Sequence, residues 1–299
     1  MAIRDVVRAL ALHYLPSTWA RRLKAMQMRR RRAAVEAHPP LSEEEFRRFA
    51  RERLGFEPGA AVFVHSSEDL LHLAFSPLRL LEILLELVGD EGTLLFPTFP
   101  SEGTYEVLRS GRVFDVRRTP GGTGLLGELA RRLPGARRSV HPTRSVVALG
   151  RHAEALVARH HEDPYPFSAS SPFALHAALG GRVVGLGVST KNLTLVHVLD
   201  DLRPERLPCS PYVAERFDAR CRRADGVEVV VAAYAHDQRR MTFDVPRFVR
   251  DHVVGEVARD FRWRGMDFFR VEAGPFLARL DGLSATGITI YGDGPGRES

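Results

Sequence analysis

Short runs of apolar residues alternate along the chain with longer segments whose apolar residues recur every three or four positions. The short runs are typical of buried strands, and the longer segments are typical of amphipathic helices. We expect strands at residues 60–64, 92–96, 145–149 and 182–186, and helices at residues 42–54, 77–88, 152–159 and 172–179. Because helices that alternate with strands cover both faces of a sheet, the pattern predicts an α/β fold.

A hairpin is expected further along the chain. Residues 212–220 and 227–234 have the composition of strands, and the segment Ala224-Asp225-Gly226 between them supplies a glycine for a tight turn. A hairpin adds an antiparallel pair to the alternating elements. The central sheet is therefore predicted to be mixed.

An N-terminal extension precedes the alternating pattern. Residues 1–36 read as two helical stretches that are broken at Pro16, and His38-Pro39-Pro40 is a linker, so we place the extension and linker at residues 1–40 and the main domain at residues 41–299. The extension has apolar stripes flanked by arginines. One interpretation is peripheral contact with an anionic membrane surface through residues 1–36. The other is packing on the domain or on a second subunit of a homo-oligomer.

The net charge of +6 is concentrated in this extension. Residues 1–40 contain nine basic and two acidic residues, so the rest of the chain carries about −1. A neutral body does not favour nucleic-acid binding across the fold. The two cysteines, Cys209 and Cys221, have no C-x-x-C spacing and give no disulfide framework, which is typical of a reducing compartment such as the cytoplasm. No run of 18 apolar residues predicts a helix that spans a membrane.

One histidine is the first candidate for catalysis. Residues 194–202 read as a short helix, and on it His197 and Asp200 lie three positions apart on one face. Asp200 can therefore orient the imidazole or hold its charged form. An imidazole with a pKa near neutrality suits general-base removal of a proton from an amine. The alternative is a structural histidine inside the domain.

Further candidates lie in turns that follow or precede strands. His65, Ser66 and Ser67 follow the first strand, where ligands commonly bind in open α/β sheets. The turn at residues 118–124, which contains Thr119, leads into a helix and can bind an anion there. His141 and Ser145 precede another strand. For each turn, local hydrogen bonds without a ligand are the alternative.

Other chemistries are less well supported. His160, His161, Glu162 and Asp163 are consecutive and have no metal-ligand spacing, so we expect a solvated helix end and no metal. A serine hydrolase that uses Ser66 or Ser145 would lack the G-x-S-x-G elbow. Asp244 opens a predicted helix and either presents its carboxylate to a cationic acceptor or caps that helix.

The order of these motifs resembles the aminoglycoside 3-N-acetyltransferase family over residues 45–285. The motifs that carry the resemblance are Val64-His-Ser-Ser67, residues 89–98, Phe114-Asp115, Arg118-Thr-Pro120, Arg138-Ser-Val-His-Pro142, Gly185-Leu-Gly187 and Thr194-x-x-His197. The resemblance implies a three-layer α/β/α fold, acetyl-CoA as donor, no metal, and His197 as general base. From their positions in the turns we also expect cofactor contacts from Ser66, Ser67, Thr119 and Ser145, and acceptor contacts from His141 and Asp244. Of these, His141 and Ser145 match the family's serine-containing cofactor region.

The chain departs from the family pattern in two places. Asp200 stands where many members have glutamate, and residues 68–75 contain no glycine where members commonly have a glycine-rich turn. The expected function is N-acetylation of an aminoglycoside or a related amino sugar, a small-molecule amine acceptor. The alternatives are an acyltransferase that acts on a sugar-nucleotide or polysaccharide precursor amine, and a non-catalytic binding protein that retains the fold.

Overall fold

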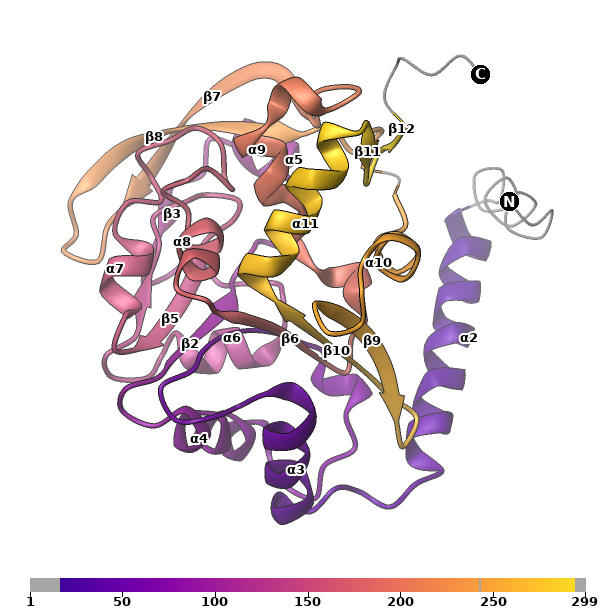
Figure 1. The fold of residues 1–299 in the computed structure, drawn as a ribbon. Helices are drawn as coiled ribbons and strands as arrows, with labels where there is room; N and C mark the ends of the chain where they lie inside the picture. The colour runs from indigo at the N-terminus through magenta and orange to yellow at the C-terminus, as the bar shows by residue number, and fades with distance from the viewer. Residues whose placement is uncertain (1–16, 242, 294–299) are drawn as a thin grey trace.

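A seven-stranded sheet forms the centre of the protein in a computed structural model, which describes residues 17–241 and 243–293 (Figure 1). The strands lie in the order β4-β5-β2-β1-β6-β10-β9. Their bounds are β1 Ala61–Ser66, β2 Thr93–Pro97, β4 Arg137–Arg138, β5 Val146–Gly150, β6 Arg182–Leu186, β9 Ala258–Trp263 and β10 Met266–Glu272. Strand β1 is parallel to β2 and β6, whereas β4, β5, β9 and β10 pair antiparallel. The predicted mixed sheet is confirmed.

Helices cover both faces of this sheet, as the alternating pattern predicted. Along β1, Phe63 points into one apolar core, and its neighbours Val62 and Val64 point into the other. The first core includes side chains of α7 (Ala153–Val157), α8 (Pro172–Ala178), α9 (Val198–Leu202), α10 (Val245–His252) and α11 (Ala273–Ala285). The second includes side chains of α3 (Glu43–Phe49), α4 (Pro77–Val88) and α6 (Leu125–Ala130). The fold is therefore a three-layer α/β/α sandwich.

The helix starts follow capping rules that can be recognised in the sequence. Ser42 accepts a hydrogen bond from the backbone of Glu45, and the Glu45 side chain accepts one in return, which is the predicted capping box of α3. A single π-turn, Ala50–Leu54, continues α3 as far as the predicted end of the helix. Ser76 caps α4, and Pro77 occupies its first turn.

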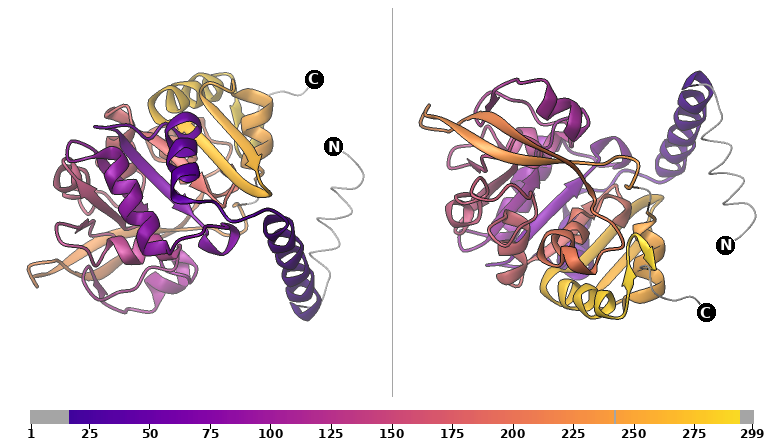
Figure 2. Two further views of the ribbon diagram at one scale, coloured as in Figure 1. Left: turned by 90° about the horizontal axis from the view of Figure 1, so that it is seen from below. Right: turned by 90° about the horizontal axis from the view of Figure 1, so that it is seen from above.

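The hairpin of β7 (Tyr212–Arg222) and β8 (Glu228–His236) lies outside the central sheet and forms a second, three-stranded sheet with β3 (Phe114–Asp115). The prediction of an antiparallel hairpin is confirmed, although the hairpin does not join the central sheet. The hairpin is long, and its turn at residues 223–226 projects beyond the central sheet (Figures 1 and 2). At its base, Tyr212 faces His236, and these two residues lie at the candidate site described below.

Short elements complete the chain. They are the helix α5 (Thr104–Arg109), the 3₁₀ turns η2 (Glu68–Leu70), η3 (Thr190–Asn192), η4 (Thr194–His197) and η5 (Pro204–Arg206), and the strands β11 (Ile288–Thr289) and β12 (Gly292–Asp293). Strands β11 and β12 form a small C-terminal hairpin. It follows α11, and Ile288 and Ile290 of this segment pack against the first core.

The basic helix α2 (Ser17–Glu36) projects from the body and meets it near its C-terminal end (Figure 2). Arg32 forms an ion pair with Asp69 at 2.9 Å, and Val35 is buried. The first of the two predicted N-terminal helical stretches lies outside the described residues. Over residues 17–241 and 243–293, no helix combines the length and apolar character that crossing a bilayer requires.

Candidate active site

The carboxyl ends of the parallel strands β1, β2 and β6 meet at one edge of the sheet, where a cavity of about 750 Å³ opens. Ser66 and Ser67, both predicted as ligand contacts, line it, and His65 and Thr194 lie on the same wall. Its other lining residues are Glu68, Asp69, Pro97, Phe99, Gly122, Thr123, Gly124, Leu125, Lys191 and Asn192. The topology thus brings two of the four predicted cofactor residues into one cavity.

A carboxylate of the protein itself occupies the N-terminus of α6 beside this cavity. Glu68 accepts hydrogen bonds from the backbone N–H groups of Leu125 and Leu126, each at 3.1 Å, and from the Ser66 hydroxyl at 2.7 Å. We predicted that the turn at residues 118–124 could offer this helix end to an external anion. In the structure Glu68 already satisfies the N–H groups of Leu125 and Leu126, which is the alternative of hydrogen bonds within the protein and no ligand.

His197 and Asp200 are hydrogen-bonded and almost fully buried. His197 Nδ1 lies 2.8 Å from Asp200 Oδ2, and the two residues are 7% and 2% exposed. The shared face predicted for them is therefore present, although the first turn is 3₁₀ (η4) and only the second is α-helical (α9). Since the carboxylate accepts a hydrogen bond from Nδ1–H, the neutral imidazole has its lone pair on His197 Nε2, as a general base needs.

The 3₁₀ turn connects His197 to the cavity. Side chains three residues apart are eclipsed in a 3₁₀ helix, so Thr194 and His197 lie on the same face of η4. Thr194 lines the cavity, and its hydroxyl lies 3.4 Å from His65 Nε2. Burial lowers the pKa of His65 to about 3, so this imidazole is neutral at physiological pH.

Tyr291 is a member of the site that sequence reasoning missed. It lies between β11 and β12 and donates its phenolic hydrogen bond to Asp200 Oδ2, the oxygen that also binds His197. Burial and the neighbouring Asp200 carboxylate raise the pKa of the phenol, which keeps it protonated as a donor. No sequence motif marks Tyr291, because its contact spans 91 residues of chain.

Aromatic rings enclose the imidazole of His197. The ring centroids of Phe167, His236 and Phe243 lie 5.3, 5.7 and 5.4 Å from that of His197. Such contacts restrict rotation of the imidazole and exclude water from its faces. The general-base candidate is therefore fixed by packing as well as by its carboxylate partner.

Arg144 lies between the cavity and His236. Its guanidinium carbon is 4.9 Å from the ring centroid of Phe99, which lines the cavity, and one terminal nitrogen is 3.5 Å from His236 Nδ1. Burial lowers the pKa of Arg144 to about 10, so it remains a cation near neutral pH. Among residues 17–241 and 243–293, no carboxylate lies within 4 Å of this guanidinium, and its Nε is buried without a hydrogen-bond partner.

Asp201 adds a second, partly buried carboxyl next to the pair. Its two oxygens accept hydrogen bonds from the Tyr212 hydroxyl and from the backbone of Phe167, each at 2.7 Å. Burial raises the pKa of Asp201 to about 8, which outweighs the opposing effect of these hydrogen bonds. At neutral pH most of this carboxyl is protonated, so it contributes little negative charge.

His141 lies near this group but is closed off from solvent. It is fully buried, stacks on His160 at a centroid distance of 4.6 Å, and accepts hydrogen bonds through Nδ1 from the backbone of Arg144 and Thr143. His160 is also buried, and its two ring nitrogens bond to Ser139 and to the Pro166 carbonyl. The predicted solvated helix end is therefore wrong for His160, which anchors the loop from inside.

The remaining predicted contacts are separated from the cavity. Ser145 is fully buried, and its hydroxyl donates to the Thr98 carbonyl at 2.9 Å and accepts from Arg138. Thr119 bonds to the backbone of Asp115 and lines a different hollow, of about 440 Å³. Asp244 is exposed and caps α10 by accepting from the Arg247 backbone, the second of the two roles expected for it.

Two backbone N–H groups in these turns are already bonded within the fold. Ser67 N–H donates to the Leu186 carbonyl, and Thr119 N–H donates to the Asp115 carbonyl. Neither group is therefore free to donate to a developing oxyanion.

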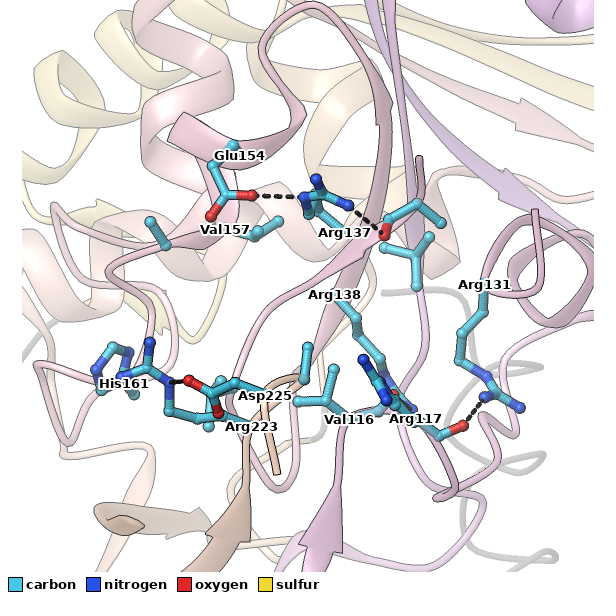
Figure 3. A pocket seen from close by; sticks show the side chains of 15 residues that line it. Val116, Arg117, Arg131, Arg137, Arg138, Glu154, Val157, His161, Arg223 and Asp225 are labelled. Carbon is cyan, nitrogen blue, oxygen red and sulfur yellow. Dashed lines mark hydrogen bonds and ion pairs between the residues drawn. The ribbon is translucent and has the colours of Figure 1, made fainter. Parts of the chain in front are cut away.

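A second concave region of about 430 Å³ lies between β4, α7 and the tip of the long hairpin (Figure 3). It is rich in arginine, but its two carboxylates are paired within it: Arg137 with Glu154 at 2.6 Å and Arg223 with Asp225 at 3.7 Å. It contains none of the residues predicted for catalysis or for binding. Concavity alone therefore does not identify the active site. The strand-end cavity is lined by Thr194, which lies one 3₁₀ turn before His197, although His197 itself is not among the lining residues.

Comparison with known proteins agrees with this architecture. Residues 63–266 match the family model described as aminoglycoside 3-N-acetyltransferase. Aminoglycoside N(3)-acetyltransferase VII of Streptomyces paromomycinus is 34% identical over 48% of this chain and 55% of its own length. The type III enzyme of Serratia marcescens is 27% identical over 74% and 77% of the two chains. Relatives such as the Streptomyces protein are thus matched over little more than half of their length.

Solved structures show the same fold over a larger share of the chain. AAC-VIa with sisomicin bound is 25% identical and superposes with a TM-score of 0.67, over 83% of this chain and 99% of its own. AAC-IIIb in a binary complex with CoASH is 22% identical, with a TM-score of 0.67 over 86% and 99%. From the family match and the shared three-layer fold, the chain belongs to the aminoglycoside 3-N-acetyltransferase family.

Proposed function

We propose that this protein transfers an acetyl group from acetyl-CoA to an amine of an aminoglycoside or a related amino sugar. The observation that carries the proposal is the buried His197–Asp200 pair beside a strand-end cavity. Membership of the family supports the reaction class. An aminoglycoside is proposed as the substrate because the chain belongs to this family.

The proposed mechanism is direct attack. The acceptor reacts as the neutral amine, its ammonium form having first released a proton to solvent. His197 Nε2 removes one proton from this amine as it attacks, and Asp200 stabilises the imidazolium that forms. The amine nitrogen then forms a bond to the thioester carbonyl carbon, and the carbon–sulfur bond breaks. The thiolate of CoA leaves and takes up the proton that His197 holds. General-base assistance of this kind contributes about 10²–10⁴-fold to the rate.

The cavity fits the neutral part of the donor better than its phosphates. Its volume of about 750 Å³ is within the usual range for ligand sites. Its charged lining consists of Glu68, Asp69 and Lys191, and the N–H groups at the start of α6 already bond to Glu68. We therefore place the pantetheine arm and acetyl group along Ser66, Phe99 and Thr194, with the phosphates outside the cavity.

The first test separates donor binding from turnover. Thermal unfolding with and without acetyl-CoA, with ATP and NAD as controls, measures donor binding, and ligand at 100 times its dissociation constant stabilises by about 2.7 kcal/mol. We expect His197→Ala to retain this shift but to lose about 10²-fold or more in turnover. His38→Ala, which removes an exposed histidine of the linker that follows α2, is the matched control. Near-normal turnover in His197→Ala would remove this residue from the mechanism, and no shift with millimolar acetyl-CoA would remove the donor.

The basic helix α2 is assigned a peripheral role in this proposal. It carries seven basic residues and one acidic residue, which suits contact with an anionic membrane surface, while Val35 and Arg32 attach its C-terminal end to the domain. Sedimentation with anionic and neutral vesicles tests this contact. Light scattering tests the alternative, in which α2 joins two subunits. The proposed compartment is the cytoplasm, because Cys209 and Cys221 are free thiols.

A further inference from the structure

We infer that the arginine-rich concave region of Figure 3 is a second ligand-binding site, separate from the active site, and that it binds a small phosphate ester with a planar body, such as a nucleoside monophosphate. The inference goes beyond the proposed function, because no step of the acetyl transfer uses this region. It rests on the charge of the walls, on the apolar lining between them and on the separation from the strand-end cavity.

Arginine side chains reach this region from separate elements of the fold. Figure 3 shows them around the hollow: Arg117 after β3, Arg131 after α6, Arg137 and Arg138 in β4, and Arg223 in the turn of the long hairpin. More than a hundred residues of chain separate the first from the last. Tertiary folding therefore gathers these guanidinium groups, and no single basic stretch of the sequence accounts for them.

The positive charge of the walls exceeds the negative charge that compensates it. Three of the five arginines form ion pairs: Arg131 with Glu128, Arg137 with Glu154 and Arg223 with Asp225. Within the described part of the chain, Arg117 and Arg138 form none. Two positive charges therefore remain without a carboxylate. A concave region lined by an excess of one charge raises the local concentration of ions of the opposite charge.

The two uncompensated arginines contribute in different ways. Arg138 is 8% exposed, and its guanidinium donates to carbonyl and hydroxyl oxygens of the protein, so it supplies charge without free donors. Burial and the neighbouring Arg131 lower the pKa of Arg138 to about 9, and it remains a cation near neutral pH. Arg117 is exposed, and among the described residues its hydrogen bonds use only its backbone. Its planar fork of N–H groups is free to bind a phosphate.

His161 adds a polar group that the protein leaves unsatisfied. It lines the region, and its Nδ1 is buried without a hydrogen-bond partner in the described part of the chain. A buried polar atom that lacks a partner is unfavourable. A ligand that fills the hollow can supply the partner from a hydroxyl or a phosphate oxygen.

The surface between the charged groups is apolar. It consists of valine and alanine side chains: Val116, Val140, Val147, Val157, Ala136 and Ala158. The volume of about 430 Å³ lies in the usual range for sites that bind organic molecules, which combine an apolar lining with a few polar groups. An inorganic anion alone would leave this lining uncovered. The lining thus favours a ligand with a planar body in addition to its phosphate.

The region is separate from the cavity proposed for the acyl donor. The two share no lining residue. Arg138 connects them through the protein: it lines the arginine-rich region and donates to the carbonyl of Thr98, whose neighbours Pro97 and Phe99 line the donor cavity. A ligand in one region therefore leaves the other open.

Isothermal titration calorimetry on the full-length protein saturated with CoA tests the site while the donor cavity is occupied. Three probes separate the parts of the ligand. Adenosine 5′-monophosphate carries both parts, inorganic phosphate carries the anion alone, and adenosine carries the planar body alone. We expect adenosine 5′-monophosphate to bind about 10-fold or more tightly than either of the other two, because it uses both Arg117 and the apolar lining.

Variants of Arg117 locate the binding. Arg117→Ala should weaken binding of adenosine 5′-monophosphate by about 10-fold and leave that of adenosine unchanged. Arg117→Lys keeps the charge without the planar fork and should retain part of the affinity. Arg118→Ala is the matched control, since this neighbouring arginine is also exposed but does not line the region. Thermal unfolding shows that each variant is folded.

The inference is overturned if adenosine 5′-monophosphate does not bind at millimolar concentration, or if Arg117→Ala leaves its affinity unchanged. An equal loss in Arg118→Ala also overturns it, because the effect would then come from overall charge. Binding that occurs only without CoA would place the nucleotide in the donor site and rule out a second one. Failure of CoA itself to bind contradicts the proposed function instead, and the same titration without CoA then tests the arginine-rich region.

Discussion

Tyr291 donates a hydrogen bond to the oxygen of Asp200 that also binds the imidazole of His197. One carboxylate oxygen therefore holds the base and is itself held by a phenol from the C-terminal hairpin. Asp200 is one methylene shorter than the glutamate expected from the family pattern, so its reach is smaller. Tyr291 compensates by fixing the position of the shorter side chain.

Replacement of Tyr291 by phenylalanine tests this compensation. The variant keeps the ring that packs against Phe243 and loses only the hydrogen bond. A hydrogen bond to a charged group contributes about 1.5–3 kcal/mol, so we expect turnover to fall by about 10-fold or more while acetyl-CoA binding is retained. A pH–rate profile should show a shifted acidic limb, which is the limb on which a general base takes up a proton. Unchanged turnover and an unchanged profile would show that Tyr291 only packs.

The pKa of Asp201 predicts how stability depends on pH. Its folded value of about 8 lies above the ordinary value of 3.8, so between about pH 4 and about pH 8 the folded protein holds a proton that the unfolded chain releases. This contribution to the free energy of unfolding is present at low pH and is lost as the pH rises through that window.

Asp201→Asn removes this titration and retains an oxygen for one of its two hydrogen bonds. We expect the free energy of unfolding of the variant, relative to that of wild type, to increase by more than about 1 kcal/mol from about pH 5 to about pH 9. Urea unfolding at each pH measures this difference. Asp218→Asn, at an exposed site of β7, is the control and should follow wild type. Parallel pH dependence of Asp201→Asn and wild type would contradict the raised pKa.

A close contact in the sheet predicts the cost of a single methyl group. A Cβ at Gly185 would lie 2.1 Å from the ring of Phe269, its neighbour across β6 and β10. We expect Gly185→Ala to destabilise by about 1–3 kcal/mol, since the core must shift to accept the extra volume. Gly282→Ala in α11 meets no atom within 4 Å and should stabilise by about 0.5–1 kcal/mol. Chemical unfolding measures the change in the free energy of unfolding for each variant. Equal changes in the two variants would show that the sheet accommodates a methyl group at Gly185 without cost.

Local sequence rules predicted most of the fold. Apolar periodicity placed β6 at its observed bounds, and the serines before α3 and α4 cap those helices as expected. These features depend on residues that are neighbours in sequence. The hairpin was also predicted, but its separation from the central sheet was not, because strand patterns do not identify the partner sheet.

Sequence reasoning predicted only those residues of the site that lie close to one another in the sequence. His197 and Asp200 are three residues apart, and Ser66 and Ser67 follow a strand, so spacing alone indicated both pairs. Tyr291 and Arg144 join through contacts that depend on the tertiary fold. Ser145 was expected at the cofactor, yet its hydroxyl bonds to Thr98 and Arg138 inside the protein. A serine in a motif looks the same in sequence whether it faces a ligand or a neighbouring strand.

The contact between Asp200 and Tyr291 also has a consequence for the order of assembly. It joins the middle of the chain to the C-terminal hairpin, so the base acquires its final support only after α11 has folded back over the sheet. Appearance of activity during refolding should lag behind formation of the central sheet, which makes catalysis a reporter of complete folding.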